Sequence, residues 1–201
     1  MRLCLIGPVD GRAPVLARAV AVALDQLRAD AIVYLGVDDA LDIVGAAWMS
    51  LLGVEAPLAE RVAAVVDADA EAIHQTLQAE HLARRLSRVR ALASATSRSV
   101  ELVHDRIVLL VADKADLDEE DLLPASLIIF GRGSPTLRRV GTRVFLSPGT
   151  PGKAGEGILL LDEGEGDGTV TVTFCDVAGV VRQREVLEAT RGARVRVQGA
   201  V

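Results

Sequence analysis

The first forty residues combine short apolar runs with a helical repeat. Residues 2–6 form a continuous apolar run that ends at Gly7 and Pro8, and residues 13–27 then place apolar side chains at helical spacing. A second apolar run covers residues 31–35 and ends at Gly36. Short apolar runs that stop at glycine are typical of buried strands, so this segment predicts a strand, a helix and a second strand parallel to the first.

The middle of the chain has a helical pattern and the second half has a strand pattern. Residues 57–94 are rich in Ala, Leu, Glu and Arg without internal Gly or Pro, which predicts one long helix or two stacked helices. Eight later runs are bounded by turn residues and predict strands. They are residues 100–103, 107–111, 126–130, 143–146, 157–161, 170–174, 180–186 and 194–197.

Length and composition fit one α/β domain. A chain of 201 residues can bury a core without disulfide or metal cross-links, so we expect a single domain over 1–201 with a helical segment at about 55–97. Half of the residues are hydrophobic but only 2% are aromatic, so the core must consist of aliphatic side chains. The two cysteines, Cys4 and Cys175, lie in distant apolar runs and are expected to be buried thiols.

Charge and hydropathy exclude two classes of partner. The net charge of −6 and the pI near 5.1 oppose binding to a phosphate backbone, so nucleic acid is not an expected partner. The longest lightly charged stretch, residues 43–54, is far shorter than the roughly 20 residues that cross a bilayer. The short apolar start is also too small for a signal peptide. We therefore expect a cytoplasmic protein that does not insert into membranes.

Four stretches carry a resemblance to a known family. They read Leu3-Cys-Leu-Ile-Gly-Pro-Val-Asp-Gly11, Ile32-Val-Tyr-Leu-Gly36, Leu127-Ile-Ile-Phe-Gly131 and Val144-Phe-Leu-Ser-Pro-Gly-Thr150. Together they resemble the calcineurin-like metallophosphoesterases, in particular the small bacterial and archaeal phosphodiesterases and the scaffold subunit of the retromer coat. The resemblance spans most of the chain. It implies a two-sheet αββα sandwich, with a long helical insertion after the second strand.

The residues that the family uses to bind metal are absent from the matching positions. Family members hold two metal ions through carboxylates, an asparagine and histidines at strand ends, and the metal pair clamps phosphate and activates water. The resemblance places aliphatic, proline or guanidinium side chains, or displaced polar groups, at these positions. They are Pro8, Asp10, Val37, Ala112, Arg132 and Ser134. We therefore expect no metal or other cofactor, and we assign no catalytic residue.

A rearranged metal site is one alternative. Asp10, Asp38, Asp39 and Asp113 are expected near the same ends of parallel strands, and four carboxylates could hold Mg²⁺ or Ca²⁺. The chain would then be a divalent-metal-dependent phosphodiesterase or phosphatase. The three histidines do not help, because His74 and His81 are seven residues apart on a helix and His104 is expected at a hairpin tip.

Metal-free anion binding is a second alternative. Arg12 and Arg132, together with the start of the first helix, could hold phosphate or a nucleotide without hydrolysing it. The chain would then act as a phosphate or nucleotide sensor. Ser134 and Thr150 have no histidine or lysine base placed beside them, so nucleophilic catalysis is not expected.

The remaining candidate surface is apolar. Residues 43–53 hold the only tryptophan and the only internal methionine, and Trp48, Met49, Leu51 and Leu52 are candidate interface residues, although core packing is an open alternative. The long helix carries an arginine-rich run at residues 84–90 and could support homo-oligomers. The sequence thus favours a catalytically inactive domain that binds or scaffolds an unidentified protein partner.

Overall fold

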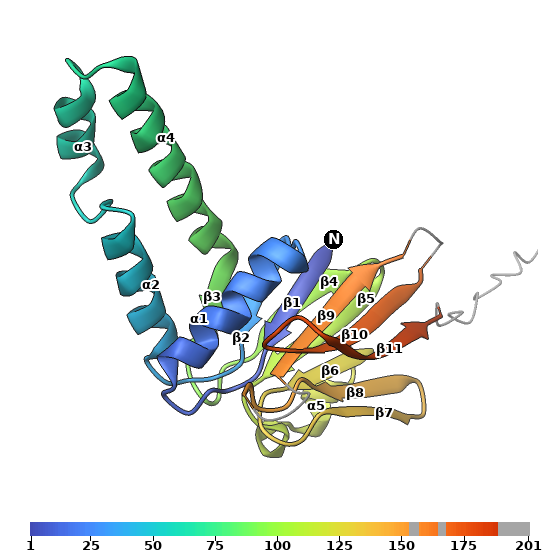
Figure 1. Ribbon diagram of the computed structural model, residues 1–201. Coiled ribbons are helices and arrows are strands. Elements are labelled where there is room, and N and C mark those ends of the chain that lie inside the picture. Colours follow the sequence, from blue (N-terminus) through green and yellow to red (C-terminus); the bar gives the residue numbers. More distant parts are fainter. Residues whose placement is uncertain (153–156, 165–167, 189–201) are drawn as a thin grey trace, which may run out of the picture.

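Two β-sheets pack face to face in the computed structural model, which describes residues 1–152, 157–164 and 168–188 (Figure 1). The larger sheet has the strand order β11-β10-β9-β1-β2-β3, in which β1, β2 and β3 are parallel and β9 to β11 are antiparallel. Its strands are β1 (Arg2–Ile6), β2 (Ala31–Tyr34), β3 (Val89–Ala91), β9 (Gly157–Glu163), β10 (Val170–Asp176) and β11 (Val181–Leu187).

The smaller sheet has the order β4-β5-β6-β8-β7. Its three central strands are parallel, and each edge strand is antiparallel to its neighbour. The strands are β4 (Ser99–Val103), β5 (Arg106–Val111), β6 (Leu127–Phe130), β7 (Thr136–Val140) and β8 (Arg143–Ser147). The parallel strands β1, β2, β5, β6 and β8 match apolar runs that predict strands.

The main core lies between the two sheets. Successive side chains of a strand point to opposite faces, so Leu3 and Leu5 of β1 face the second sheet while Cys4 and Ile6 face outward. Leu110 and Ile129 of the smaller sheet pack in the same core as Leu3 and Leu5. Every one of these side chains is fully buried, which explains why the strands are apolar at consecutive positions.

Helices cover the outer faces unequally. The larger sheet is covered by α1 (Ala13–Ala21), the π-helical turn η1 (Val22–Gln26) and the first half of α2 (Ala40–Leu51). Among the described residues, the outer face of the smaller sheet is covered by η3 (Lys114–Asp116) and α5 (Glu119–Leu122) with their flanking loops. The resulting α-β-β-α layering is the expected two-sheet sandwich, and the prediction of fold class is confirmed.

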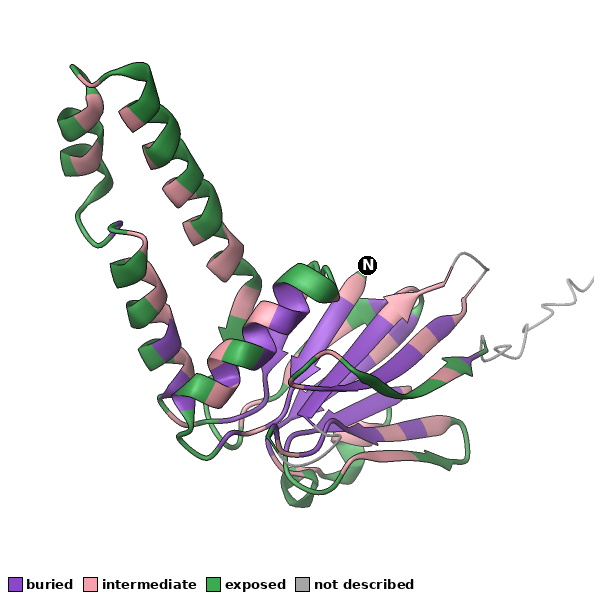
Figure 2. Cartoon of the chain, viewed as in Figure 1, coloured by how far each residue is buried: buried purple, intermediate pink, exposed green. Residues whose placement is uncertain are grey.

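The expected helical insertion after β2 projects from the sandwich as an arm (Figures 1 and 2). It contains the distal half of α2, α3 (Leu58–Val65) and α4 (Ala70–Arg85), and η2 (Leu86–Arg88) returns the chain to β3. We call residues 46–85 the helical arm. The helices α3 and α4, which are described over their whole length, bury no side chain completely. Asp69 caps α4 by accepting a hydrogen bond from the Ala72 amide at 2.8 Å.

Two strands differ from the sequence prediction. Val89–Ala91 continues the helical pattern in sequence but forms β3, because its backbone pairs with β2 and extends the larger sheet. Thr136–Val140 is not among the predicted strands but forms β7, an edge strand in which Arg138 and Arg139 are exposed. The strand predicted at 194–197 lies outside the described residues.

Two smaller expectations also have clear outcomes. Cys4 and Cys175 are both buried free thiols, as predicted, and burial raises the pKa of each. Over the ranges that the structure describes, no helix is both long and apolar enough to cross a bilayer.

Candidate functional site

A cleft of about 490 Å³ lies where the parallel strands end. Loops that follow β1, β2, β3, β5 and β6 form its walls, because the carboxyl ends of parallel strands in the two sheets meet at the same end of the sandwich. Among the predicted positions, Pro8, Asp10, Val37, Ala112 and Arg132 all line this cleft. Thr96 and Asp116 also line it and were not predicted from the sequence.

Asp38 lies in the cleft wall and its carboxylate connects three segments. Oδ2 accepts a hydrogen bond from the Gly11 amide at 2.8 Å, and Oδ1 accepts from the Tyr34 hydroxyl at 2.9 Å and from the Ala40 amide at 3.2 Å. These donors belong to the β1–α1 loop, to β2 and to the start of α2. Three acceptor positions of this carboxylate are therefore already used in holding the loops.

Tyr34 is the buried partner in this network. Its side chain is fully buried, and its oxygen accepts a hydrogen bond from the Val9 amide at 3.0 Å while its hydroxyl donates to Asp38. Burial raises the pKa of Tyr34, the hydrogen bond from the Val9 amide lowers it, and the neighbouring Asp38 raises it, so the hydroxyl stays protonated and can donate. One feature of the sequence hints at this role, because Tyr34 is the only tyrosine of the chain and lies in an otherwise aliphatic strand.

The other three aspartates of the alternative metal site are held differently. Asp113 caps η3 by accepting from the Ala115 amide at 3.0 Å, and its second oxygen lies 3.6 Å from Nη1 of Arg132. The Arg132 side chain is 71% exposed, so this ion pair is worth at most about 1 kcal/mol. Asp10 is exposed and has a positive φ of 53°, and Asp39 precedes α2 outside the cleft lining.

This donor set does not fit a pair of divalent cations. A dinuclear site needs oxygen and imidazole donors that converge from several strand ends. Here Pro8, Val37, Ala112 and Arg132 occupy the cleft wall, and the best-placed carboxylate, Asp38, is engaged by backbone amides and a hydroxyl. Across the described part of the chain, no three His, Cys, Asp or Glu side chains are grouped so that they could hold an ion.

Two predicted positions, Ser134 and Arg12, lie away from the cleft. Ser134 lies outside its lining, at the start of the β7 hairpin, where its carbonyl accepts from the Thr136 hydroxyl. Arg12 is also outside, because its guanidinium donates to the Val9 carbonyl at 2.9 Å and to the Pro151 carbonyl at 3.0 Å. The structure therefore does not bring Arg12 and Arg132 together in one anion site.

The histidines also lie elsewhere. His74 and His81 are exposed on α4 in the helical arm, and His104 is at the β4–β5 hairpin tip with a φ of 55°. None of the three lines the strand-end cleft.

The candidate interface residues border an apolar groove between α1 and α2. The groove measures about 360 Å³, and nearly all of its lining atoms are carbon. Trp48 and Leu51 line it, Leu52 faces a separate hollow beside α4, and Met49 is partly buried. Leu51 is 86% exposed, which is unusual for a leucine and leaves part of α2 without a packing partner.

Comparison with known proteins finds similarity in structure alone. No protein-family model and no curated protein matches the chain. A conserved uncharacterised protein from Streptococcus pneumoniae TIGR4, described as a predicted phosphoesterase, is similar at a TM-score of 0.48 and 13% identity over 93% of this chain and 98% of that chain. Vps29 from Chaetomium thermophilum is similar at 0.45 and 11%, over 93% and 97%. At such identities and scores, these matches assign neither an activity nor a partner.

Proposed function

We propose that this chain is a non-hydrolytic, protein-binding domain built on a sandwich of the metallophosphoesterase type. The observation that carries the proposal is the chemistry of the strand-end cleft, where the positions expected to bind metal hold proline, valine, alanine and arginine. These side chains cannot replace carboxylate and imidazole as metal ligands. The cleft is therefore a poor place to assemble two cations around a phosphate.

The state of Asp38 supports the same conclusion. Three of the roughly four lone pairs of this carboxylate already accept hydrogen bonds, from the Tyr34 hydroxyl and from two backbone amides, so a metal held by both oxygens would displace at least one of them. The Val9 amide and the Tyr34 oxygen are buried, so breaking this network would leave polar groups without partners. Binding a metal here would thus work against the stability of the loops that form the cleft.

The helical arm supports a role in protein binding. Ile73 and Leu77 are four residues apart on α4 and therefore share one face, and they are 39% and 63% exposed. On α3, Leu58 and Val62 repeat this spacing and are also exposed. A helix that projects from its domain with apolar side chains on the surface is a typical docking element for another helix.

Charge along the arm favours a second copy of this chain as the occupant. Asp67 lies at the tip, while Arg84 and Arg88 lie at the base, and these three side chains make no ion pair with any residue that the structure describes. The helix α4 is about 24 Å long at 1.5 Å per residue. Two arms that pair in antiparallel orientation around Leu77 would place the acidic tip of each against the basic base of the other.

Light scattering during gel filtration tests the self-pairing. The wild-type chain should elute as a dimer. Leu77→Glu should weaken dimerisation by at least a hundredfold (about 3 kcal/mol), because each copy loses a leucine that the dimer would bury. Gln78→Glu adds the same charge one residue further on, about 100° around the helix, and should leave the dimer intact. A wild-type protein that stays monomeric at high concentration would show that a second copy is not the partner.

A hydrolysis assay tests the other half of the proposal. We expect no Mn²⁺-dependent or Mg²⁺-dependent hydrolysis of bis(p-nitrophenyl) phosphate above the rate in buffer. Turnover that disappears in Asp10→Asn or Asp113→Asn, and persists in the arm variant Asp67→Asn, would establish a rearranged metal site instead. The self-pairing and the absence of hydrolysis can be refuted independently, since a dimer can be active and a monomer can be inactive.

A further inference from the structure

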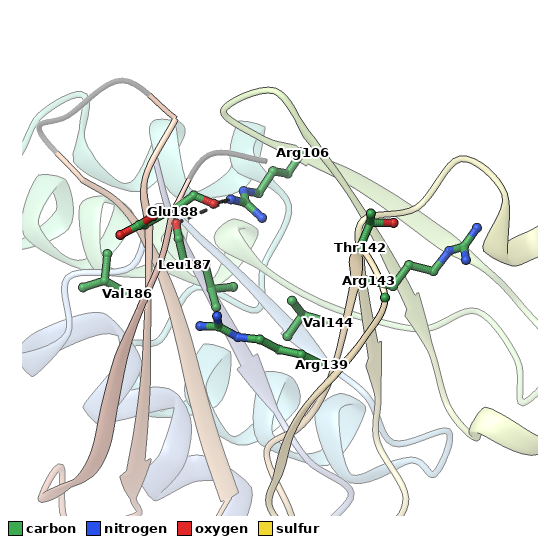
Figure 3. Close-up of a pocket in the computed structure, with 9 residues that line it drawn as sticks. Arg106, Arg139, Thr142, Arg143, Val144, Val186, Leu187 and Glu188 are labelled. Carbon is green, nitrogen blue, oxygen red and sulfur yellow. Dashed lines mark hydrogen bonds between the residues drawn. The ribbon is translucent and has the colours of Figure 1, made fainter. Parts of the chain in front are cut away.

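A second cavity lies at the end of the sandwich opposite the strand-end cleft (Figure 3). It has a volume of about 420 Å³ and sits where β5 and β8 begin and β11 ends. Its lining contains three arginines and one glutamate, together with the apolar side chains of Val144, Val186 and Leu187. A cavity with excess positive charge is notable in a protein whose net charge is −6. None of its residues belongs to the cleft described above.

Arg106, the first residue of β5, is the buried cation of this cavity. The residue is only 5% exposed, and its Nη2 donates to the carbonyl oxygens of Leu187 and Glu188. Its Nε is buried and has no hydrogen-bond partner among the described residues, and no described carboxylate lies within ion-pair distance. A buried guanidinium without a counter-ion is costly, so this group is poised to accept one.

Arg139 supplies a second guanidinium from the opposite wall. It follows Leu137 by two residues on β7 and so shares the face that points between the sheets, whereas Arg138 points to the outer face. Figure 3 shows the side chains of Arg106 and Arg139 both reaching toward the end of β11. The only ion pair of Arg139 with a described residue is a long one, 3.8 Å to Glu185, and its side chain is 58% exposed.

The two guanidinium groups influence each other. Burial lowers the pKa of Arg106, the neighbouring Asp105 raises it, and the positive charge of Arg139 lowers it again. Arg143 does not add to this pair, because its side chain points away from the other two and donates to the Leu122 carbonyl at 2.8 Å. The repulsion therefore concentrates between Arg106 and Arg139, where an anion would relieve it.

We propose that this cavity binds a small phosphorylated molecule through Arg106 and Arg139. Guanidinium groups bind the oxygens of a phosphate group in pairs, and a dianion balances two such groups. The cavity is larger than a phosphate ion, and Val144, Val186 and Leu187 provide an apolar wall for an organic group attached to it. A phosphomonoester with a small, weakly polar substituent satisfies both halves of the site.

Calorimetry and thermal unfolding with phenyl phosphate and inorganic phosphate test the proposal, at constant ionic strength against chloride. Both ligands should bind and raise the melting temperature, and phenyl phosphate should bind more tightly because its ring contacts the apolar wall. Arg139→Gln should weaken the affinity for phenyl phosphate about tenfold, the value of one charge-assisted hydrogen bond. Arg139 is the residue to change, since it is exposed and Arg106→Gln could unfold the chain.

Two control variants make the result specific. Arg138→Gln removes the same charge from the outer face of β7, and Arg132→Gln removes the arginine of the strand-end cleft, and both should bind phenyl phosphate like the wild type. Three results would overturn the proposal: equal affinity of Arg139→Gln and wild type, loss of binding in Arg132→Gln, or stabilisation by acetate as strong as by phosphate. None of these results depends on whether the chain dimerises or hydrolyses phosphodiesters.

Discussion

The hydrogen bonds of Tyr34 and Asp38 offer the most direct test of how the cleft is built. If this network is structural, Tyr34→Phe and Asp38→Ala should both lower the free energy of unfolding without changing the fold. Tyr34→Phe removes the acceptor of the buried Val9 amide and the donor to Asp38 while keeping the ring. Asp38→Ala removes the acceptor for the Tyr34 hydroxyl and for two backbone amides.

The size of each loss can be worked from these contacts. A buried amide left without a partner costs about 1–3 kcal/mol, so Tyr34→Phe should destabilise the protein by about 2 kcal/mol. Asp38→Ala removes three hydrogen bonds to a charged acceptor, but the carboxylate is partly exposed, and water can replace part of the loss. We expect about 2–3 kcal/mol for this variant. The double variant should lose about 1 kcal/mol less than the sum, because both changes delete the same Tyr34–Asp38 bond.

Urea unfolding followed by far-ultraviolet circular dichroism measures these values. The midpoint should fall in each variant while the slope of the transition stays constant, which would show a change in stability rather than in compactness. A Tyr34→Phe variant within about 0.5 kcal/mol of wild type would refute the structural role of the hydroxyl. Strictly additive losses in the double variant would show that the two side chains do not interact.

Two further predictions concern the strand ends and the β10–β11 turn. A Cβ on Gly7 would lie 1.8 Å from the Gly149 carbonyl oxygen, so Gly7→Ala should destabilise the protein by about 3 kcal/mol or more in the same urea assay. Gly45→Ala is the matched control, because no described atom lies within 4 Å of its Cβ position on α2, and it should stabilise by about 0.5–1 kcal/mol. The Asp176 carboxylate accepts from two backbone amides and from Arg182, and although burial raises its pKa, these contacts outweigh burial and lower it. A carboxyl group whose pKa is lowered by folding stabilises the folded state at pH values above its unfolded pKa of about 4, and this stabilisation is lost as the pH falls through its folded pKa. The melting temperatures of wild type and Asp176→Asn should therefore differ at pH 7 and converge in acid. A constant difference down to pH 2 would contradict that assignment.

The sequence predicts all of the described strands except two edge strands, β3 and β7. Buried parallel strands such as β1 and β6 are apolar on both faces and end at glycine, so the pattern is local and visible. The edge strands β3 and β7 carry arginines on one or both sides, and each pairs with one described neighbour only. Their strand conformation comes from that neighbour, which a local pattern does not reveal.

In the candidate site, positions at strand ends can also be predicted, whereas contacts between distant side chains cannot. Pro8, Val37, Ala112 and Arg132 meet in one cleft because the direction of each strand fixes where its carboxyl end lies, and that direction can be inferred from the sequence. Arg12 was expected beside them, but its guanidinium binds the carbonyl of Pro151, 139 residues away. Arg106 and Arg139 likewise line the same cavity only because of how the two sheets meet. Contacts of this kind arise from packing and lie outside what spacing can predict.

The glycines at the strand ends are required by the way the two sheets pack against each other. Gly7 backs onto the Gly149 carbonyl, and a Cβ on Gly131 would lie 2.8 Å from the Leu35 carbonyl oxygen. These close approaches join the end of one sheet to the loops of the other, so the sandwich requires glycine there whether or not a metal is bound. The neighbouring positions, Val37 and Arg132, point into an open cleft and are exposed, so the fold places no comparable demand on them. The strand-end glycines therefore report the architecture, and evidence for function must come from the side chains between them.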